Sequence, residues 1–312
     1  MFCFEEGKYY RFGLAMGLAN VARNGFQLGT RKTFGKICQP INSYTRFPEY
    51  HFLGNQVEDY LTHLQSSERI RVLDVGSPKC FSLYLAFHFD IEIHLTDIDA
   101  ATVREAETLW HAVKDRGKGT ALFSIQDARA LKFPDEQFDI TYSMSVVEHV
   151  EGNAGDSDSV REMLRVTKPG GLFLLTVPIG ERYVEQERAG FEGAARKTYD
   201  YKHYFFQRIY TPAMAQERII KAVPGAKLRK AVTISRNNGP VSSLYRRLGA
   251  DFRGLIGALN PVLSAAINDS QEGILPARSH YGLLHSARDV YGDLLLAWEN
   301  GSSSAKAVTH HR

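Results

Sequence analysis

Two kinds of hydrophobic segment alternate through the middle of the chain. Five short runs rich in apolar and β-branched residues have the length of buried strands, and three other segments have the apolar spacing of helices. The strand-like runs are residues 69–75, 91–97, 121–125, 138–145 and 172–178; the helix-like segments are residues 81–89, 101–114 and 159–166. This alternation predicts a parallel sheet with helices on both faces.

The pattern changes on either side of this region. Residues 7–28 are rich in Tyr, Phe, Leu and Ala and predict one or two short helices, and residues 53–64 predict another. We interpret residues 1–68 as a helical cap or lid that precedes the sheet. The polar, Gly- and Ala-rich residues 180–197 suit a mobile lid, and the Ser-, Ala- and His-rich residues 299–312 suit a flexible tail.

The turn after the first strand-like run is a feature that points to a ligand. The run ends at Gly76, which is followed by Ser77, Pro78 and a helix-like segment. A strand, a tight glycine turn and a helix leave backbone N–H groups and a helix N-terminus where a ligand can bind. Asp74 stands in the strand, where a carboxylate is costly unless it is paired or faces a ligand. By itself the turn also fits an ordinary strand-turn-helix unit, because it matches neither G-x-G-x-x-G nor G-x-x-x-x-G-K-[ST].

Acidic residues also end the second and third strand-like runs. Asp97 follows the glycine turn by about 20 residues, the spacing at which an acid can accept both hydroxyls of a ribose. Asp97 could instead cap the helix at residues 101–114, but Asp99 is nearer to that helix and is the better candidate for the cap. Asp127 follows the third run and can accept a hydrogen bond from an exocyclic amine such as that of adenine. These acids predict one ligand site at the carboxyl edge of the sheet.

The composition limits the partners that we expect. The net charge of +3 is too small to indicate nucleic acid binding. No apolar run reaches the ~18 residues that a membrane helix needs. The three cysteines have no metal-ligand spacing and suit a reducing compartment, and the early residues Glu5 and Glu6 are followed by no apolar signal core. We therefore expect a cytoplasmic protein without a metal site.

Taken together, the motifs resemble those of class I S-adenosylmethionine-dependent methyltransferases. In that family an apolar strand is followed by an acid, an apolar residue and Gly-x-Gly; here Asp74-Val75-Gly76-Ser77-Pro78 stands at this place, with Pro78 where a second glycine is usual. Residues 138–150 match the fourth-strand motif of the subgroup that methylates small molecules, and residues 161–171 match the turn before the fifth strand. The resemblance covers residues 72–178 well and continues weakly to Trp298.

The resemblance implies S-adenosyl-L-methionine as the cofactor, together with the residues that hold it. The matching cofactor-binding positions are Asp74, Gly76, Ser77, Pro78, Asp97, Ile98, Asp127, Ala128, Ser143 and Ser145. The implied fold is a Rossmann-like, doubly wound α/β sheet of about seven strands, mostly parallel with an antiparallel final strand. Residues 226–235 and 292–298 can supply the closing hairpin of the family. We therefore expect a methyltransferase domain at residues 69–298, with a helical insertion at about residues 237–286.

Methyl transfer by in-line displacement needs an aligned acceptor and removal of its proton, but no covalent intermediate. His149, just beyond the fourth strand, is the first candidate for the base because an imidazole titrates near neutral pH. It could instead cap a helix or hold a loop. His203, in the aromatic segment at residues 199–210, is the second candidate.

The function that we predict is transfer of a methyl group from S-adenosyl-L-methionine to a small-molecule acceptor, at oxygen in the first instance (EC 2.1.1.-). One alternative is a non-catalytic partner that keeps the methyltransferase fold, which Pro78 in the cofactor turn would favour. Another is a methyltransferase that acts on a lipid-linked substrate, because residues 245–256 have a basic amphipathic pattern that suits peripheral membrane contact. A third is another group transfer from the same cofactor class, as in polyamine synthases. We expect no nucleic acid partner.

Overall fold

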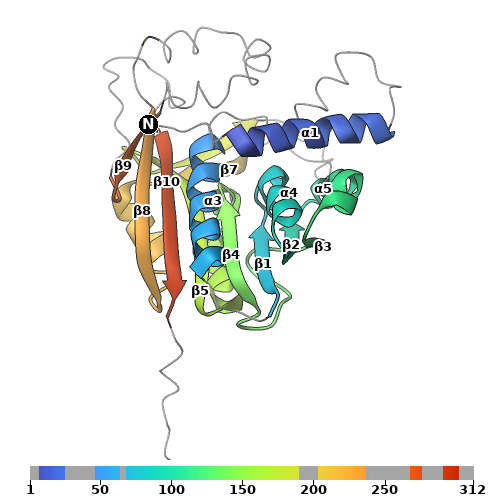
Figure 1. The fold of residues 1–312 in the computed structure, drawn as a ribbon. Helices are drawn as coiled ribbons and strands as arrows, with labels where there is room; N and C mark the ends of the chain where they lie inside the picture. The colour runs from blue at the N-terminus through green and yellow to red at the C-terminus, as the bar shows by residue number, and fades with distance from the viewer. Residues whose placement is uncertain are drawn as a thin grey trace, which may run out of the picture.

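The computed structural model describes residues 7–24, 46–63, 68–189, 203–236, 240, 268–275 and 291–301. Within these residues, eight strands form one sheet in the order β3-β2-β1-β4-β5-β10-β8-β9 (Figure 1). The strands are β1 (Ile70–Val75), β2 (Ile91–Asp97), β3 (Thr120–Ile125), β4 (Phe138–Met144), β5 (Thr167–Gly180), β8 (Ala226–Arg236), β9 (Asn268–Glu272) and β10 (Tyr291–Asn300). The doubly wound α/β architecture is therefore confirmed.

The strand directions agree with the prediction for most of the sheet. β1 pairs in parallel with β2 and β4, and β3 and β5 extend the parallel part on either side. β10 is antiparallel to both β5 and β8, as expected for the closing hairpin. The chain runs outward from β1 to β3 and then returns to β4 on the other side of β1, so the order of strands reverses between β1 and β4. Ligands bind in open α/β sheets at the carboxyl ends of the strands beside such a reversal.

The count of strands differs from the prediction because of β9. This strand pairs antiparallel with β8 and adds an eighth strand at the edge of the sheet. It lies inside the stretch for which a helical insertion was expected, residues 237–286; apart from residues 240 and 268–275, that stretch lies outside the described residues. The sequence of β9 is polar and only five residues long, so hydrophobic periodicity could not reveal it.

Each central strand supplies side chains to two separate cores, since successive residues of a strand face opposite sides of a sheet. Val72 and Leu174 pack into the core on one face, and their neighbours Leu73 and Leu175 pack into the core on the other. The first core is covered by α1 (Gly7–Asn24), α3 (Arg46–His63), α4 (Lys79–His88) and α5 (Ala100–Val113), and the second by α6 (Gly155–Val166), α7 (Pro212–Ala215) and η5 (Gln216–Ile220). The continuous apolar runs of the sequence thus reflect burial on both faces.

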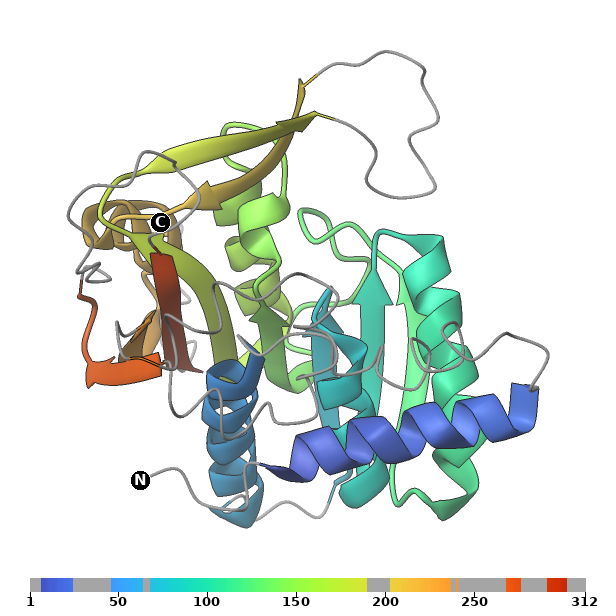
Figure 2. The same ribbon diagram turned by 90° about the horizontal axis from the view of Figure 1, so that it is seen from above.

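Helices are present in both N-terminal segments for which the sequence predicts them, and they pack on the first face. Residues 25–28 of the first segment lie outside the described residues. α1 lies across α4 and α5 (Figures 1 and 2). Near its start the Tyr9 ring lies 4.5 Å from the Tyr84 ring of α4, and near its end the Arg23 guanidinium donates a hydrogen bond to the carbonyl of His111 in α5. α3 begins at Arg46, several residues before the predicted start. Their role as a cap or lid, and the domain limits of 69–298, stay predictions.

A second, two-stranded sheet was not predicted. β6 (Val184–Ala189) pairs antiparallel with β7 (His203–Ile209), and Tyr210 just after β7 forms a bridge with Ile179 of β5. The sequence predicted a polar lid and an aromatic loop in these positions, since β6 shows little apolar alternation and is held by backbone pairing. Residues 190–202 lie outside the described residues, as do residues 302–312 of the expected tail.

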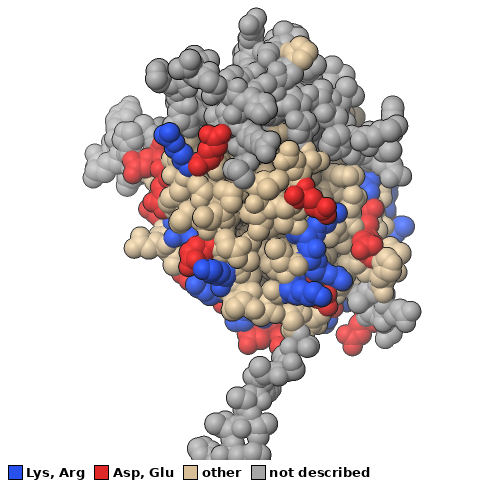
Figure 3. Space-filling model, turned by 90° about the vertical axis from the view of Figure 1, so that its left-hand side faces the viewer, with Lys and Arg blue, Asp and Glu red and all other residues tan. Residues whose placement is uncertain are grey.

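On the face of the molecule drawn in Figure 3, acidic and basic side chains lie side by side, so neither positive nor negative charge dominates this face. Among the described residues, Arg229 and Glu299 form one ion pair near the surface, with their charged atoms 3.3 Å apart. None of the helices that the structure describes is both long and apolar enough to cross a membrane.

Candidate cofactor and active site

A pocket of about 290 Å³ lies at the carboxyl edge of the parallel strands. Its walls come from the loops after β1, β2, β3 and β4, which meet beside the reversal of strand order. Six of the residues predicted from the sequence line it, namely Gly76, Asp97, Ile98, Asp127, Ala128 and His149. The structure thus brings together the tips of all three acidic strands, as expected.

Gly76 lines this pocket at a position where the backbone and the neighbouring side chain leave room only for glycine. Its φ of +71° lies in the left-handed region, and a Cβ on it would lie 2.6 Å from Cγ1 of Val146. The Gly76 N–H donates to the carbonyl of Thr96 at 3.0 Å, which ties the β1 turn to β2. Pro78 follows as the N-cap of α4 with a φ of −57°, a position that suits a residue without an N–H.

Asp74 holds the turn and does not line the pocket. Its carboxylate is fully buried and accepts hydrogen bonds from the Ser77 N–H at 2.9 Å and from the Ser82 hydroxyl at 2.5 Å. Lys79 Nζ lies 3.4 Å from the same carboxylate. Ser82 in turn accepts from the Tyr142 hydroxyl at 2.7 Å. The cost of a buried charge at this strand end is therefore met by partners inside the protein.

Lys79 is a functional candidate that the sequence analysis missed. Its side chain is 9% exposed, its Nζ donates to the carbonyl of Thr96 at 2.8 Å, and it lies 3.6 Å from the Asp97 carboxylate as well as close to Asp74. One lysine thus lies between two carboxylates of neighbouring strands. Its place directly after Pro78, at the first position of α4, is the only signal that the sequence offered.

Asp97 presents a carboxylate to the pocket, as predicted for the ribose acid. The side chain is 16% exposed, and one oxygen accepts from the Asp99 N–H at 3.0 Å. Burial raises the pKa of Asp97, and the nearby Lys79 ammonium opposes this rise. Asp99 caps α5 by accepting from the N–H groups of Ala101 and Thr102, as predicted, and the role of Asp97 as the ribose acid stays a prediction. Ile98 beside them is 68% exposed and offers an open apolar surface to the pocket.

Asp127 also lies in the pocket, but with a partner that was not predicted. Arg129 donates to both of its carboxylate oxygens, with Nε at 3.0 Å from one and Nη2 at 2.7 Å from the other. This bidentate hydrogen bond lowers the pKa of Asp127. An exocyclic amine would therefore share the carboxylate with Arg129.

The remaining predicted positions are not among the residues that line the pocket. The Ser143 hydroxyl donates to the carbonyl of Val75 at 2.9 Å, and the Ser77 hydroxyl accepts from the Met144 N–H at 3.0 Å. Both side chains are buried between β1 and β4, so they fasten the two strands together. Ser145, Pro78 and Asp74 likewise are not among the lining residues. Contact of these five residues with the cofactor stays a prediction.

His149 lies at the mouth of the pocket at the end of η4 (Val147–His149), in an orientation that suits a base. Its Nδ1 lies 2.6 Å from the carbonyl oxygen of Phe206, and because a carbonyl can only accept, Nδ1 carries the hydrogen. The ring of Phe206 packs edge-on against the imidazole at 4.9 Å. In the neutral ring Nε2 then holds the lone pair, and this atom lies 3.7 Å from a carboxylate oxygen of Glu148. His203 is the first residue of β7, and its side chain lies outside the described residues.

A second polar cluster lies where the parallel pairing of β4 with β5 ends. The buried carboxylate of Glu49, from the first turn of α3, accepts from the Ser145 hydroxyl and from the Thr176 hydroxyl, both at 2.5 Å. Ser145 adopts a φ of +50°, which is strained for a residue with a side chain. The next residue, Val146, lines the pocket and packs over Gly76. Only the fold brings Glu49 here, so the strand motifs gave no sign of it.

Among the described residues, no group of three or more His, Cys, Asp or Glu side chains is arranged to hold a metal ion.

Comparison with known proteins gives the same assignment for the centre of the chain. The family described as a methyltransferase domain matches residues 73–175, which run from β1 through the middle of β5. This segment is a class I S-adenosylmethionine-dependent methyltransferase domain. The match supports the predicted family for this segment and S-adenosyl-L-methionine as its cofactor.

The individual proteins that resemble this chain do so over a short segment or at low sequence identity. A 2-methyl-6-phytyl-1,4-hydroquinone methyltransferase of Synechocystis is 41% identical over 56 residues, which are 18% of this chain and 17% of that protein. The chain thus matches only a small part of this curated relative. A methyltransferase structure from Methanosarcina mazei is 16% identical, with 79% of this chain and 97% of that chain covered and a TM-score of 0.49. A phosphoethanolamine N-methyltransferase of Haemonchus contortus, solved with S-adenosyl-L-methionine, is 15% identical, covers 80% and 53%, and has a TM-score of 0.42.

The residues in the pocket fit the nucleoside part of this cofactor. The glycine at φ +71° leaves a backbone surface that a Cβ would fill, Asp97 presents a carboxylate that can accept from ribose hydroxyls, and Ile98 presents an apolar surface for a flat base. The methionine end would lie toward the turn at Ser77 and Pro78, where the second glycine of the family is replaced.

Proposed function

We propose that the protein transfers the methyl group of S-adenosyl-L-methionine to a small-molecule acceptor, at an oxygen atom. The observation that carries this proposal is the gathering of Gly76, Asp97, Ile98 and His149 around one pocket at the reversal of strand order. The relative that methylates a hydroquinone supports a small hydroxylated aromatic acceptor as the first class to test. The bound cofactor would supply an electrophilic methyl group on a sulfonium sulfur.

Residues on one side of this sheet edge would bind the cofactor, and residues on the other side would bind and activate the acceptor. Asp97 and Ile98 would hold the nucleoside, and the Gly76 turn would let the cofactor approach the backbone closely. His149 would take the proton of an acceptor hydroxyl at Nε2, because Nδ1 is committed to Phe206. The Glu148 carboxylate near Nε2 would then stabilise the imidazolium. Glu49, Ser145 and Thr176 would form the polar wall on the acceptor side.

The cofactor part of this proposal is tested by calorimetry with S-adenosyl-L-methionine. Asp97→Ala should weaken cofactor binding by at least several-fold, because loss of two hydrogen bonds at a partly buried site costs about 1–3 kcal/mol. Asp90→Ala is the matched control, since Asp90 is 77% exposed at a surface turn and pairs with Arg69. Equal affinity in both variants would contradict the assignment of Asp97. No binding to the parent protein would favour the non-catalytic alternative.

The chemical part is tested by a methyl-transfer screen over phenols, alcohols, acids, amines, sugars and lipids. With an acceptor in hand, His149→Ala should slow turnover by about 10²–10⁴-fold while cofactor affinity stays nearly unchanged. The parent rate should fall at low pH as an imidazole protonates, and the variant should lose this dependence. A small loss of rate would mean that alignment alone drives the reaction. Turnover of membrane-borne acceptors only would favour the lipid-linked alternative.

A further inference from the structure

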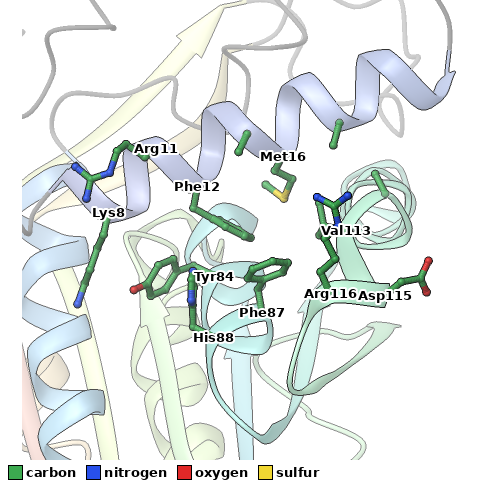
Figure 4. A pocket seen from close by; sticks show the side chains of 13 residues that line it. Lys8, Arg11, Phe12, Met16, Tyr84, Phe87, His88, Val113, Asp115 and Arg116 are labelled. Carbon is green, nitrogen blue, oxygen red and sulfur yellow. The ribbon is translucent and has the colours of Figure 1, made fainter.

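A second pocket, of about 640 Å³, lies under α1 on the helical face of the molecule (Figure 4). Its lining comes from α1, the C-terminal part of α4, the end of α5 and η3 (Lys114–Arg116). It shares no lining residue with the pocket at the sheet edge. Its volume falls within the range of about 300–1,000 Å³ that is usual for small-molecule sites.

The pocket exists because small side chains stand where α1 crosses the other helices. Ala15 and Ala19, one turn apart on α1, and Ala112 on α5 all line it. α1 is fastened on either side of this stretch by the ion pair of Lys8 with Glu58 of α3 and by the bond of Arg23 to α5. A helix held near both ends cannot collapse onto the gap that the alanines leave.

One wall of the pocket is made of aromatic rings. The ring of Phe12, from α1, lies 5.6 Å from that of Tyr84, 5.3 Å from that of Phe87 and 5.8 Å from that of His88, all three on α4. Figure 4 shows these rings together below α1, with Met16 beside them. Such a wall offers ring edges and faces to another aromatic ring at the usual offset or edge-to-face distances.

The rim of the pocket is positively charged. Lys8, Arg11 and Arg116 line it, against the single acid Asp115. In Figure 4 the guanidinium of Arg116 reaches up toward α1, whereas the carboxylate of Asp115 points away from the rings. The pKa of His88 inside the pocket is lowered, first by burial and then by the charges of Lys118 and Lys8, which agrees with a positive surrounding.

We propose that this pocket binds a small aromatic carboxylate, separately from the cofactor and acceptor. The ring of the ligand would pack on the wall formed by Phe12, Tyr84 and Phe87 beneath the alanines of α1. Its carboxylate would accept hydrogen bonds from Arg116, which as a planar fork can bind both oxygens. A neutral ring would leave Arg11 and Arg116 without an anionic partner, and a simple anion would make no contact with the aromatic wall.

The proposal is tested by calorimetry of the full chain with 2-naphthoate as the probe. The expected result is saturable binding of one probe per chain below about 1 mM. The neutral isostere 2-naphthamide should bind about tenfold more weakly, because it cannot make charge-assisted hydrogen bonds. Acetate should not compete. Absence of saturable binding, equal binding of the amide, or effective competition by acetate would each overturn the proposal.

Two variant pairs locate the probe in this pocket. Ala19→Phe should fill the space and abolish binding, whereas Ala22→Phe, on the same helix but outside the lining, should leave it unchanged. Arg116→Gln should weaken binding about fivefold, and Arg104→Gln, exposed on α5 and outside the lining, should not. Unchanged affinity for S-adenosyl-L-methionine in all four variants confirms that each is folded. Full binding in Ala19→Phe would place the probe elsewhere and overturn the proposal.

Discussion

Two stretches of the same sheet edge are built in different ways. At the tips of β1 and β2, the acids contact groups that are close in the sequence: Asp74 accepts from Ser77, and Asp97 from Asp99. At the tips of β4 and β5, Glu49 accepts from Ser145 and Thr176, which are 96 and 127 residues away. The first stretch is thus a local turn that a motif can encode. The second exists only after α3 has packed against the sheet.

This difference separates the two functions assigned to the edge. In the function that we propose, the local stretch is the cofactor side, where Gly76 and Asp97 line the pocket. The long-range stretch would serve the acceptor, and its strained residue Ser145 directly precedes Val146 of the pocket wall. A local motif can be shared by many chains with one cofactor, whereas acceptor groups recruited from outside the motif can change from chain to chain.

The largest effect is expected from breaking the local stretch with Gly76→Val. The new side chain meets Val146 and is strained at positive φ, so the free energy of unfolding should fall by about 3 kcal/mol or more. Cofactor binding should be lost at the same time. Denaturant unfolding and calorimetry measure the two effects.

Gly170→Val is the matched control for this change. Gly170 has a φ of +76°, close to that of Gly76, but a Cβ on it would meet nothing within 4 Å. Backbone strain alone should cost about 1–3 kcal/mol and leave cofactor affinity unchanged. If both variants bind the cofactor equally well, the cofactor does not lie over the Gly76 turn.

A smaller loss of stability is expected from breaking the long-range stretch with Glu49→Ala. The hydroxyls of Ser145 and Thr176 lose their buried acceptor, which should lower the free energy of unfolding by about 1–3 kcal/mol. Cofactor affinity should change by less than about twofold, since Glu49 does not line the pocket. Urea unfolding followed by cofactor titration checks both values.

Glu58→Ala, also on α3, serves as the control. Glu58 forms a partly exposed ion pair with Lys8, so its removal should cost less than about 1 kcal/mol. A Glu49→Ala variant that keeps full stability but binds the cofactor poorly would move Glu49 to the cofactor side and remove the distinction between the two stretches.

The same distinction explains what the sequence could predict. The five parallel strands, the Asp99 cap and the meeting of Gly76 with Asp97 follow from hydrophobic periodicity and from turn chemistry within about 20 residues, whereas the closing hairpin was implied by the family resemblance. The strands β9 and β6 were not predicted, because their polar sequences carry little apolar periodicity and only backbone hydrogen bonds pair them.

Within the site, the sequence could not predict which polar groups turn inward. Ser143 and Ser77 were assigned to the cofactor, and that assignment stays a prediction. Their hydroxyls bond between β4 and the end of β1, a role that a strand pattern cannot distinguish from contact with a ligand. Arg129 and Lys79 were missed for a related reason: each pairs with an acid that the motif expects to serve the cofactor.

The smallest and most specific effect concerns Lys79, which joins the two acids of the local stretch. The groups that face Asp97 are Lys79 from α4, Asp74 from β1 and the Asp99 cap. Burial raises the pKa of Asp97, and Lys79 opposes the rise, so Lys79→Met should raise this pKa further. A protonated Asp97 is a poorer acceptor for ribose hydroxyls. The variant's affinity for S-adenosyl-L-methionine should therefore fall several-fold as the pH decreases, more steeply than that of the parent.

Stability should change with the opposite sign in the same pH window. A carboxyl whose pKa is higher in the folded than in the unfolded state destabilises the fold when it is ionised, and this cost disappears as the pH falls through the folded-state pKa. Relative to the parent, Lys79→Met should thus gain stability on acidification while it loses cofactor affinity. Calorimetry and urea unfolding from about pH 5 to pH 8 follow the two quantities. Lys79→Arg keeps the cation and should follow the parent in both, and Lys132→Met controls for loss of an exposed charge. If the cofactor affinity and the stability of Lys79→Met follow those of the parent at every pH, Lys79 has no effect on the pKa of Asp97. The backbone alone then fixes the positions of Asp74 and Asp97.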